Sequence, residues 1–157
     1  MRPEWYLTKL KGDNYMNGIW NESNYNDAAV KDICHNCGSK TGKQSYNFFR
    51  RMNYVTGGNV WCKIWHYGNI PVAFYYANLC KNHIRLIEIA VKSEYQGKGI
   101  GRKLLFRLLR QMKEHKIGTL TFRTPINEEA QFFWLKMGAK IIDVKGTDYE
   151  MQIKIIK

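Results

Sequence analysis

The segment IRLIEIAV at residues 84–91 most constrains what this chain can fold into. From Leu86 onward it is apolar on both faces apart from Glu88, so neither face can be left in water. A strand of this kind lies in the centre of a sheet that is covered on both sides. The segment therefore predicts a layered fold in which helices flank a central sheet.

The segment QGKGIG at residues 96–101 follows this strand and leads into a basic, leucine-rich stretch. Apolar residues recur there at three- and four-residue spacing, which predicts an amphipathic helix that ends near Gly118. Amide groups at the start of a helix bind anions, and glycines allow a close approach to them. The P-loop and Rossmann patterns do not fit, because Gly101 is followed by Arg-Lys-Leu and position 102 is not glycine.

The rest of the chain predicts an α/β fold with an α+β mixed sheet. Asn127 suits a helix N-cap, and the two glutamates after it suit the positive start of a helix. The expected order is β-α-α-β-β-β-α-β-α-β-β, with a first strand at 4–10, helices within 21–38 and 44–58, a hairpin over 59–79, the strand 84–91, the glycine-led helix, a strand at 119–124, a helix between Asn127 and Gly138, and a terminal hairpin over 139–156.

Length and composition predict a single domain over residues 1–157, since a chain of 157 residues can bury a core without disulfides or metal. No apolar run approaches the roughly 18 residues that a membrane span needs. The four cysteines are expected to be reduced thiols, and the expected location is cytoplasmic. The net charge of +12 fits a phosphate-bearing ligand, a nucleic acid or a solvated helix face, so charge alone decides nothing.

Two motifs give the chain a resemblance to a known family. The pattern Gln96-x-x-Gly99-x-Gly101 resembles the pyrophosphate signature Arg/Gln-x-x-Gly-x-Gly/Ala of the GNAT N-acetyltransferases. The resemblance covers residues 59–157 specifically, and it implies a GNAT-like acyl-CoA N-acyltransferase fold with a central mixed β-sheet flanked by helices. The segment NEEAQFFWLKMGAK is similar to the family's second motif at Asn127, Ala130, Phe133, Trp134 and Gly138.

By this resemblance, acetyl-CoA is the expected cosubstrate, bound between the strand that ends at Val91 and the strand at 119–124. Backbone groups of the first strand would pair with the pantetheine arm, and the glycine segment would hold the pyrophosphate. The second motif would line the thiol end, although Phe133 and Trp134 suit core packing equally well. The expected cofactor-binding residues are Ile89, Ala90, Val91, Gln96, Gly97, Lys98, Gly99, Ile100, Gly101, Arg102, Lys103, Asn127, Ala130, Phe133 and Trp134.

Acetyl transfer to an amine needs a base for the amine and a donor for the departing thiolate. Glu88 is the candidate base, because a carboxylate in an otherwise apolar strand is costly unless it is paired or used. The alternative is a structural ion pair of Glu88 with Arg123 or Arg85.

The proton donor is harder to identify, because Trp134 occupies the position that this family usually gives to a tyrosine. The indole group can donate a hydrogen bond but cannot supply a proton in this pH range. Tyr149 is the candidate catalytic residue in its place, with Tyr75 and Tyr76 as alternatives, and release of the thiolate to solvent is a further alternative.

The predicted function is an N-acetyltransferase that acts by direct attack of a primary amine of a small molecule or peptide. One alternative acceptor is a nucleic-acid-associated amine such as aminoacyl-tRNA, and another reading is a non-catalytic coenzyme-A-binding or nucleic-acid-binding module. A membrane partner is not expected, and a homodimer would suit the family. Cys34, Cys37, Cys80 and His83 have spacings that would suit zinc, but the family fold needs no metal and none is expected.

Overall fold

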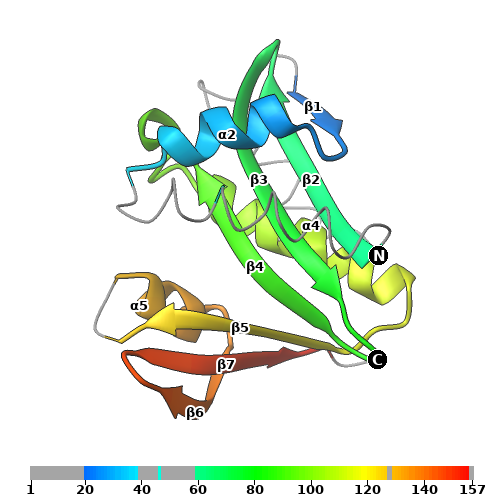
Figure 1. The fold of residues 1–157 in the computed structure, drawn as a ribbon, viewed down its shortest axis with the longest axis vertical. Coiled ribbons are helices and arrows are strands. Elements are labelled where there is room, and N and C mark those ends of the chain that lie inside the picture. The colour runs from blue at the N-terminus through cyan, green and yellow to red at the C-terminus, as the bar shows by residue number, and fades with distance from the viewer. Residues whose placement is uncertain (1–19, 39–45, 47–58, 127–128, 156–157) are drawn as a thin grey trace.

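The computed structural model describes residues 20–38, 46, 59–126 and 129–155, and these residues form a seven-stranded sheet with helices on both faces (Figure 1). The strand order is β1-β2-β3-β4-β5-β7-β6, and every neighbouring pair is antiparallel except β4 and β5. The sheet is therefore mixed, as the sequence predicts. The elements are β1 (Trp20–Ser23), α2 (Asp27–His35), β2 (Val60–Tyr67), β3 (Ile70–Leu79), β4 (Ile84–Val91), η3 (Ser93–Tyr95), α4 (Ile100–Glu114), β5 (Thr119–Pro125), α5 (Glu129–Lys136), β6 (Lys140–Lys145) and β7 (Asp148–Lys154).

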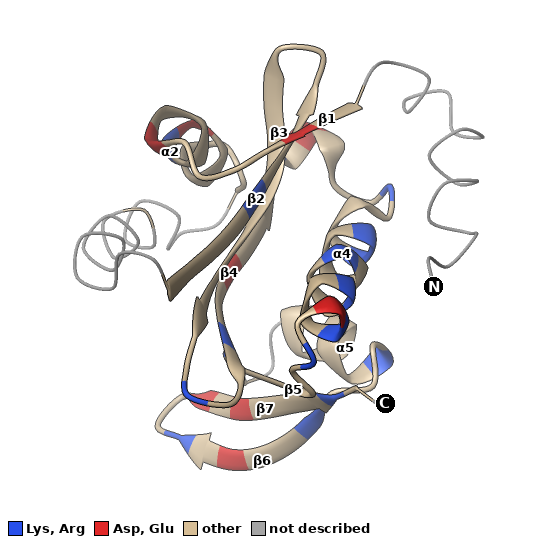
Figure 2. Ribbon diagram, turned by 90° about the vertical axis from the view of Figure 1, so that its right-hand side faces the viewer, with Lys and Arg blue, Asp and Glu red and all other residues tan. Residues whose placement is uncertain are grey.

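The helices cover the sheet from opposite sides: α2 lies on one face, while α4 and α5 lie on the other (Figure 2). Residues 72–77 of β3 are buried along their whole length between these layers. Tyr75 packs into the core with the leucines of α4, and Tyr76 packs into the core with α2. Both faces of the central strands are thus in an apolar environment, which explains the apolar run at 84–91.

The helix α2 begins where the sequence offers an N-cap. The side chain of Asn26 accepts a hydrogen bond from the amide of Ala29 at 3.0 Å, and Asp27 adds a negative charge to the first turn. The helix ends at His35, shortly before Gly38, whose φ of +74° is the left-handed conformation that favours glycine. Its buried face consists of Ala29, Val30, Ile33 and Cys34.

The helix α4 confirms the predicted amphipathic helix. Its buried face has the expected spacing, and Arg107 on its partly exposed side donates to both carboxylate oxygens of Glu22 on β1, at 2.8 and 3.0 Å. This ion pair joins the helix to the edge of the sheet. The buried residues of the helix are Ile100, Lys103, Leu104, Leu105, Leu108 and Met112.

The N-terminal part of the chain differs from expectation. The first strand that the structure describes is the short, polar β1, WNES, which has no alternating apolar pattern and was not expected from the sequence. The strand expected at 4–10 and the helix expected within 44–58 fall outside the described residues, apart from Tyr46.

The opposite edge of the sheet is β6, which is exposed along its whole length. It presents the apolar side chains of Ile141, Ile142 and Val144 to solvent. A homodimer through this edge stays a prediction. Within the ranges that the structure describes, no helix combines the length and the apolar character needed to cross a membrane.

Candidate active site

The strands β4 and β5 are paired at one end only, and a cavity opens where they diverge. Their backbone register includes just two pairs, Ile84 with Leu120 and Arg85 with Thr121. From there the two strands diverge (Figure 1). Beyond that point the strands separate and enclose a cavity of about 910 Å³. Eight of the residues predicted for the site line it: Glu88, Ile89, Val91, Gln96, Gly101, Ala130, Phe133 and Trp134.

A bulge in β4 sets the direction of Glu88. Tyr76 of β3 pairs with Glu88 and Ala77 pairs with Leu86, so Ile87 is an extra residue without a partner on β3. Glu88 therefore lies opposite Tyr76, whose side chain belongs to the core on the α2 side. One carboxylate oxygen of Glu88 accepts the amide of Ile89 at 3.2 Å. The predicted base thus lines the cavity from the face of the sheet that α2 covers.

The glycine segment forms the end of the cavity beside α4. Gly97 and Gly99 have φ values of +76° and +81°, so both adopt the left-handed conformation. The first amide to bond within the helix is that of Lys103, to the carbonyl of Gly99 at 3.1 Å. The amides of Ile100 and Gly101 therefore have no acceptor inside the helix and suit an anion.

Gly101 differs from the other two glycines of this segment. Its φ is not in the left-handed region, and a methyl group at its Cα would lie 3.8 Å from the nearest atom, Cγ2 of Val91. Neither backbone conformation nor packing against described residues therefore requires glycine here. A glycine that lines the cavity without a structural need fits the close approach of a ligand.

Gln96 holds the glycine segment in place. Its side-chain amide donates to the carbonyls of Val91, at the end of β4, and Cys37, after α2, both at 2.8 Å. The hydroxyl of Ser93 donates to the carbonyl of Asn36 at 3.1 Å, which adds a second link to α2. The segment is thus fixed to elements on both of its sides, as a preorganised binding site requires.

The three basic side chains predicted to bind phosphate differ in exposure. Arg102 is exposed on the first turn of α4 and Lys98 is half-buried, whereas Lys103 is only 2% exposed. Because Lys103 is buried, Lys98 and Arg102 are the better candidates for side chains that contact phosphate. The side chains of Ala90 and Ile100 are buried in the core, so these two residues contribute backbone rather than side-chain atoms to the site.

Lysine and arginine residues recur along α4 (Figure 2). Part of this charge is balanced, since Arg107 pairs with Glu22 and Arg110 pairs with Glu114. The alternative of a nucleic-acid-associated acceptor stays untested by this arrangement.

The helix α5 forms the wall next to β5. Trp134 is 5% exposed, and its ring centroid lies 4.1 Å from that of Phe122 on β5. Phe133 is half-buried and stands edge-on to Trp134, with 5.0 Å between centroids. Both residues therefore pack against described aromatic neighbours and line the cavity. Asn127 lies outside the described residues.

None of the tyrosines considered as acids is among the described residues that line the cavity. The hydroxyl of Tyr75 donates to the side chain of Gln111 on α4. Burial, with a smaller contribution from Cys62, raises the pKa of Tyr76 to about 12. Tyr149 is half-buried on β7, where its backbone pairs with that of Thr124.

Thr124 is a cavity residue that the sequence reasoning missed. It lies on β5, is 1% exposed and lines the cavity, yet its Oγ1 has no hydrogen-bonding partner among the described residues. A buried hydroxyl without a partner is unfavourable unless a ligand or water satisfies it. The alternation of side chains along the predicted strand TLTFRT could have indicated that Thr124 points inward.

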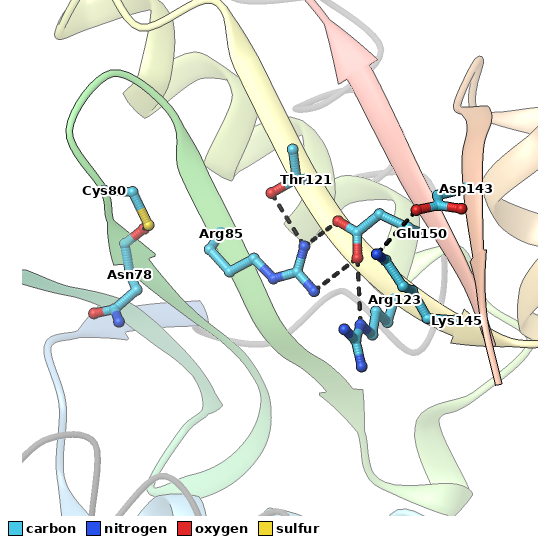
Figure 3. A network of polar contacts seen from close by, with 8 residues as sticks. All are labelled: Asn78, Cys80, Arg85, Thr121, Arg123, Asp143, Lys145 and Glu150. Carbon is cyan, nitrogen blue, oxygen red and sulfur yellow. Dashed lines mark hydrogen bonds and ion pairs between the residues drawn. The ribbon is translucent and has the colours of Figure 1, made fainter. Parts of the chain in front are cut away.

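A cluster of charged side chains lies beside the cavity, on the face of the sheet away from α4 and α5 (Figure 3). Glu150 on β7 pairs with Arg85 on β4, with one contact at 3.1 Å, and with Arg123 on β5 at 3.3 Å. Burial alone would raise the pKa of Glu150, but the two arginines outweigh burial and lower it. Both arginines considered as partners of Glu88 are thus engaged with Glu150.

The cysteine and histidine residues considered for zinc do not come together. Cys37 follows α2, and its backbone carbonyl accepts a hydrogen bond from Gln96, beyond the end of β4. Cys80 and His83 form the turn before β4 begins. No group of three or more histidine, cysteine or acidic residues is arranged for a metal in the described part of the chain.

The sequence matches the profile of the acetyltransferase (GNAT) family over residues 21–139. It is 34% identical over 64 residues to the ribosomal protein bS18-alanine N-acetyltransferase of Haemophilus influenzae. That alignment covers 41% of this chain and 44% of the relative, so it spans less than half the length of either protein.

Solved structures share the fold over most of the chain. The PaiA N-acetyltransferase of Thermoplasma acidophilum, in complex with coenzyme A, has a TM-score of 0.74 at 16% identity, covering 87% of this chain and 99% of that one. The ribosomal-protein-S18-alanine N-acetyltransferase of Escherichia coli has a TM-score of 0.71 at 16% identity, covering 87% and 94%. These similarities confirm the predicted fold class.

Proposed function

Because this chain belongs to the acetyltransferase (GNAT) family of acyltransferases, we propose that it transfers an acetyl group from acetyl-CoA to a primary amine of a peptide or protein. The observation that carries the proposal is the cavity between β4 and β5, which has Glu88 on one wall and the glycine segment at one end. A carboxylate and an anion site in one cavity suit an amine and a phosphate-bearing cosubstrate.

The chemistry of the cavity fits acetyl-CoA. On the side of β4 that faces the cavity, residues beyond Arg85 have no strand partner, so their backbone groups can pair with the amides of a pantetheine arm. The amides of Ile100 and Gly101 suit the pyrophosphate, with Lys98 and Arg102 close by in the chain. The hydroxyl of Thr124, which has no partner among the described residues, offers one more polar contact. When bound, the cosubstrate supplies the activated acetyl group.

Glu88 acts as the base in this proposal. An amine is mostly protonated near neutral pH and must lose a proton before it can attack a thioester carbonyl. The carboxylate of Glu88 takes that proton, directly or through one water molecule. The amine nitrogen forms the new bond to the acetyl carbon, the carbon–sulfur bond breaks, and the electron pair leaves with sulfur.

The departing thiolate needs a hydrogen-bond donor. Thr124 lines the cavity and its Oγ1 has no partner among the described residues, so this hydroxyl can donate to the sulfur. Tyr149 is the backbone partner of Thr124 on β7 and stays our candidate for the proton source. Trp134 contributes packing in this scheme.

Direct transfer is favoured over transfer through a cysteine. Burial, together with the charge of Glu88, raises the pKa of Cys34 to about 12. The Cys34 thiol is therefore protonated near neutral pH and is a poor nucleophile. All four cysteines are free, which suits a reducing compartment, and we propose the cytoplasm.

The acceptor class is tested by product mapping. The purified chain is incubated with acetyl-CoA and a library of peptides that contain both a free α-amine and an internal lysine, and the acetylated position is read by mass spectrometry. We expect acetylation of the α-amine, because the Haemophilus relative is named for N-acetylation of an alanine, a residue whose side chain carries no amine. Acetylation of lysine alone would exclude the α-amine as the acceptor, and acetylation of small amines alone would exclude peptides.

A further inference from the structure

The walls of the cavity carry opposite charges on the face of the sheet away from α4 and α5. On β4, Glu88 lies on the α2 side, as its pairing with Tyr76 requires. On β5, Phe122 and Thr124 face the α4 side, so Arg123 between them points to the other face. Glu88 and Arg123 both line the cavity. A group that enters from this face meets a carboxylate on one wall and a guanidinium on the other.

Arg123 has binding capacity that its ion pair does not use. Its Nε donates to Glu150 at 3.3 Å, and its terminal nitrogens have no partner among the described residues. Its side chain is 51% exposed, compared with 26% for Arg85. Arg85 by contrast directs both terminal nitrogens to Glu150 and Thr121 (Figure 3). Arg123 can therefore still bind a carboxylate through its terminal nitrogens.

The charge of the cluster also points to an anion. Two arginines face one glutamate, which leaves one positive charge in excess, while the neighbouring Lys145 and Asp143 balance each other. The glycine segment that suits cofactor phosphates leads into α4, which covers the opposite face of the sheet from the one to which Arg123 points. The positive charge of Arg123 is therefore available to the acceptor rather than to the cofactor.

We infer that Arg123 is a specificity-determining residue that selects acceptors with a carboxylate close to the reacting amine. This inference rests on the proposed function and names its substrate class. The ammonium group enters beside Glu88 and the carboxylate binds the terminal nitrogens of Arg123. Arg85 and Glu150 act as positioning residues, because Glu150 is held by Arg85 and in turn orients Arg123 through its Nε.

The test compares three peptides that begin with alanine and carry aspartate, asparagine or lysine at the second position. We expect kcat/KM of the native chain to be about tenfold to a hundredfold higher for the aspartate peptide than for the asparagine peptide, mainly through KM. Arg123→Gln should abolish that preference, Arg123→Lys should retain part of it, and Arg123→Glu should favour the lysine peptide. A free amino acid, aspartate, is the further arm that separates a small acceptor from a peptide.

Lys140→Gln is the matched control, because it removes a positive charge from the exposed β6, outside the cavity. It should leave the preference unchanged. Equal kcat/KM for the aspartate and asparagine peptides in the native chain, or an unchanged preference in Arg123→Gln, would overturn the inference. If no peptide is acetylated at all, the proposed function fails. The inference is then decided by calorimetry with coenzyme A present, which compares the Kd of the aspartate and asparagine peptides in the native chain and in Arg123→Gln.

Discussion

Arg85 on β4 and Thr121 on β5 form the last backbone pair between these strands, and their side chains are also linked by a hydrogen bond of 3.3 Å. Beyond this pair the strands diverge around the cavity. The charge cluster of Arg85, Glu150 and Arg123 lies at the same place. One location thus sets where the cavity begins and how one of its walls is charged.

Gly101→Val should weaken coenzyme A binding, whereas Gly101→Ala should be tolerated. The family signature accepts glycine or alanine at this position, and a methyl group meets only Cγ2 of Val91, at 3.8 Å. Alanine within a helix is more stable than glycine by about 0.5–1 kcal/mol, so the Tm of Gly101→Ala should be unchanged or higher. The larger side chain of valine would occupy space at the cavity lining and hold a phosphate or pantetheine away. We expect the Kd measured by calorimetry to rise at least about tenfold for Gly101→Val and to change little for Gly101→Ala. An unchanged Kd in Gly101→Val would return this segment to an ordinary turn.

Gly99→Val is a weaker test than the sequence suggests. From the sequence alone, that change is expected to abolish binding and leave the fold largely intact. The φ of +81° at Gly99 makes any β-branched residue strained at the start of α4. Loss of binding in that variant would therefore combine strain with the loss of an anion site.

Glu88→Gln should lower kcat/KM by about 10²–10⁴-fold near neutral pH, because it removes the proposed base without changing the size of the side chain. The deficit should shrink as pH rises toward and above the pKa of the acceptor amine, since the unprotonated amine is then supplied by solution. The measurement is the ratio of native to variant kcat/KM across the pH range. Glu114→Gln, at the exposed end of α4, is the control and should match the native chain. A native profile in Glu88→Gln would remove Glu88 as the base.

Trp134→Ala should lower the free energy of unfolding by about 3–5 kcal/mol, as is typical when a buried aromatic side chain is truncated. The ring packs on Phe122 and is 5% exposed. Trp134→Phe should cost less and leave kcat nearly unchanged, because the indole supplies no proton in our scheme. Urea denaturation measures the change in the free energy of unfolding, and steady-state kinetics measure kcat. A folded Trp134→Phe protein with kcat reduced about a hundredfold would instead assign the indole N–H to the chemistry.

Glu150 should make the chain less stable in acid. The arginines outweigh burial and lower its pKa in the folded protein relative to the unfolded chain, so the carboxylate stabilises the fold at neutral pH. That contribution is lost as the pH falls below about 4.5 and through the lowered pKa. Glu150→Gln should cost on the order of 1–2 kcal/mol at neutral pH, between the values for exposed and buried pairs. It should also show a smaller loss of stability in acid, and an equal loss would contradict this role.

The sequence predicts elements better than it predicts contacts between them. The strand β4, the glycine segment and the helices α4 and α5 all follow from local patterns, which is why they were found. The link between Arg85 and Glu150 joins residues 65 positions apart, and no local pattern indicates it. The alternation of TLTFRT predicts that Thr124 points inward, but it cannot say whether the hydroxyl finds a partner. The burial of Lys103 likewise depends on the packing of α4 rather than on its own segment.

The most direct test of the account is the release of free coenzyme A thiol from acetyl-CoA in the presence of a peptide with a free α-amine, beside the same peptide with a blocked α-amine. The account predicts thiol release equal, mole for mole, to acetylated peptide with the free amine, and no release above background with the blocked peptide. Equal release with both peptides would mean hydrolysis of the thioester. Such a result, or no release with any amine, would contradict the assignment of this cavity to acetyl transfer.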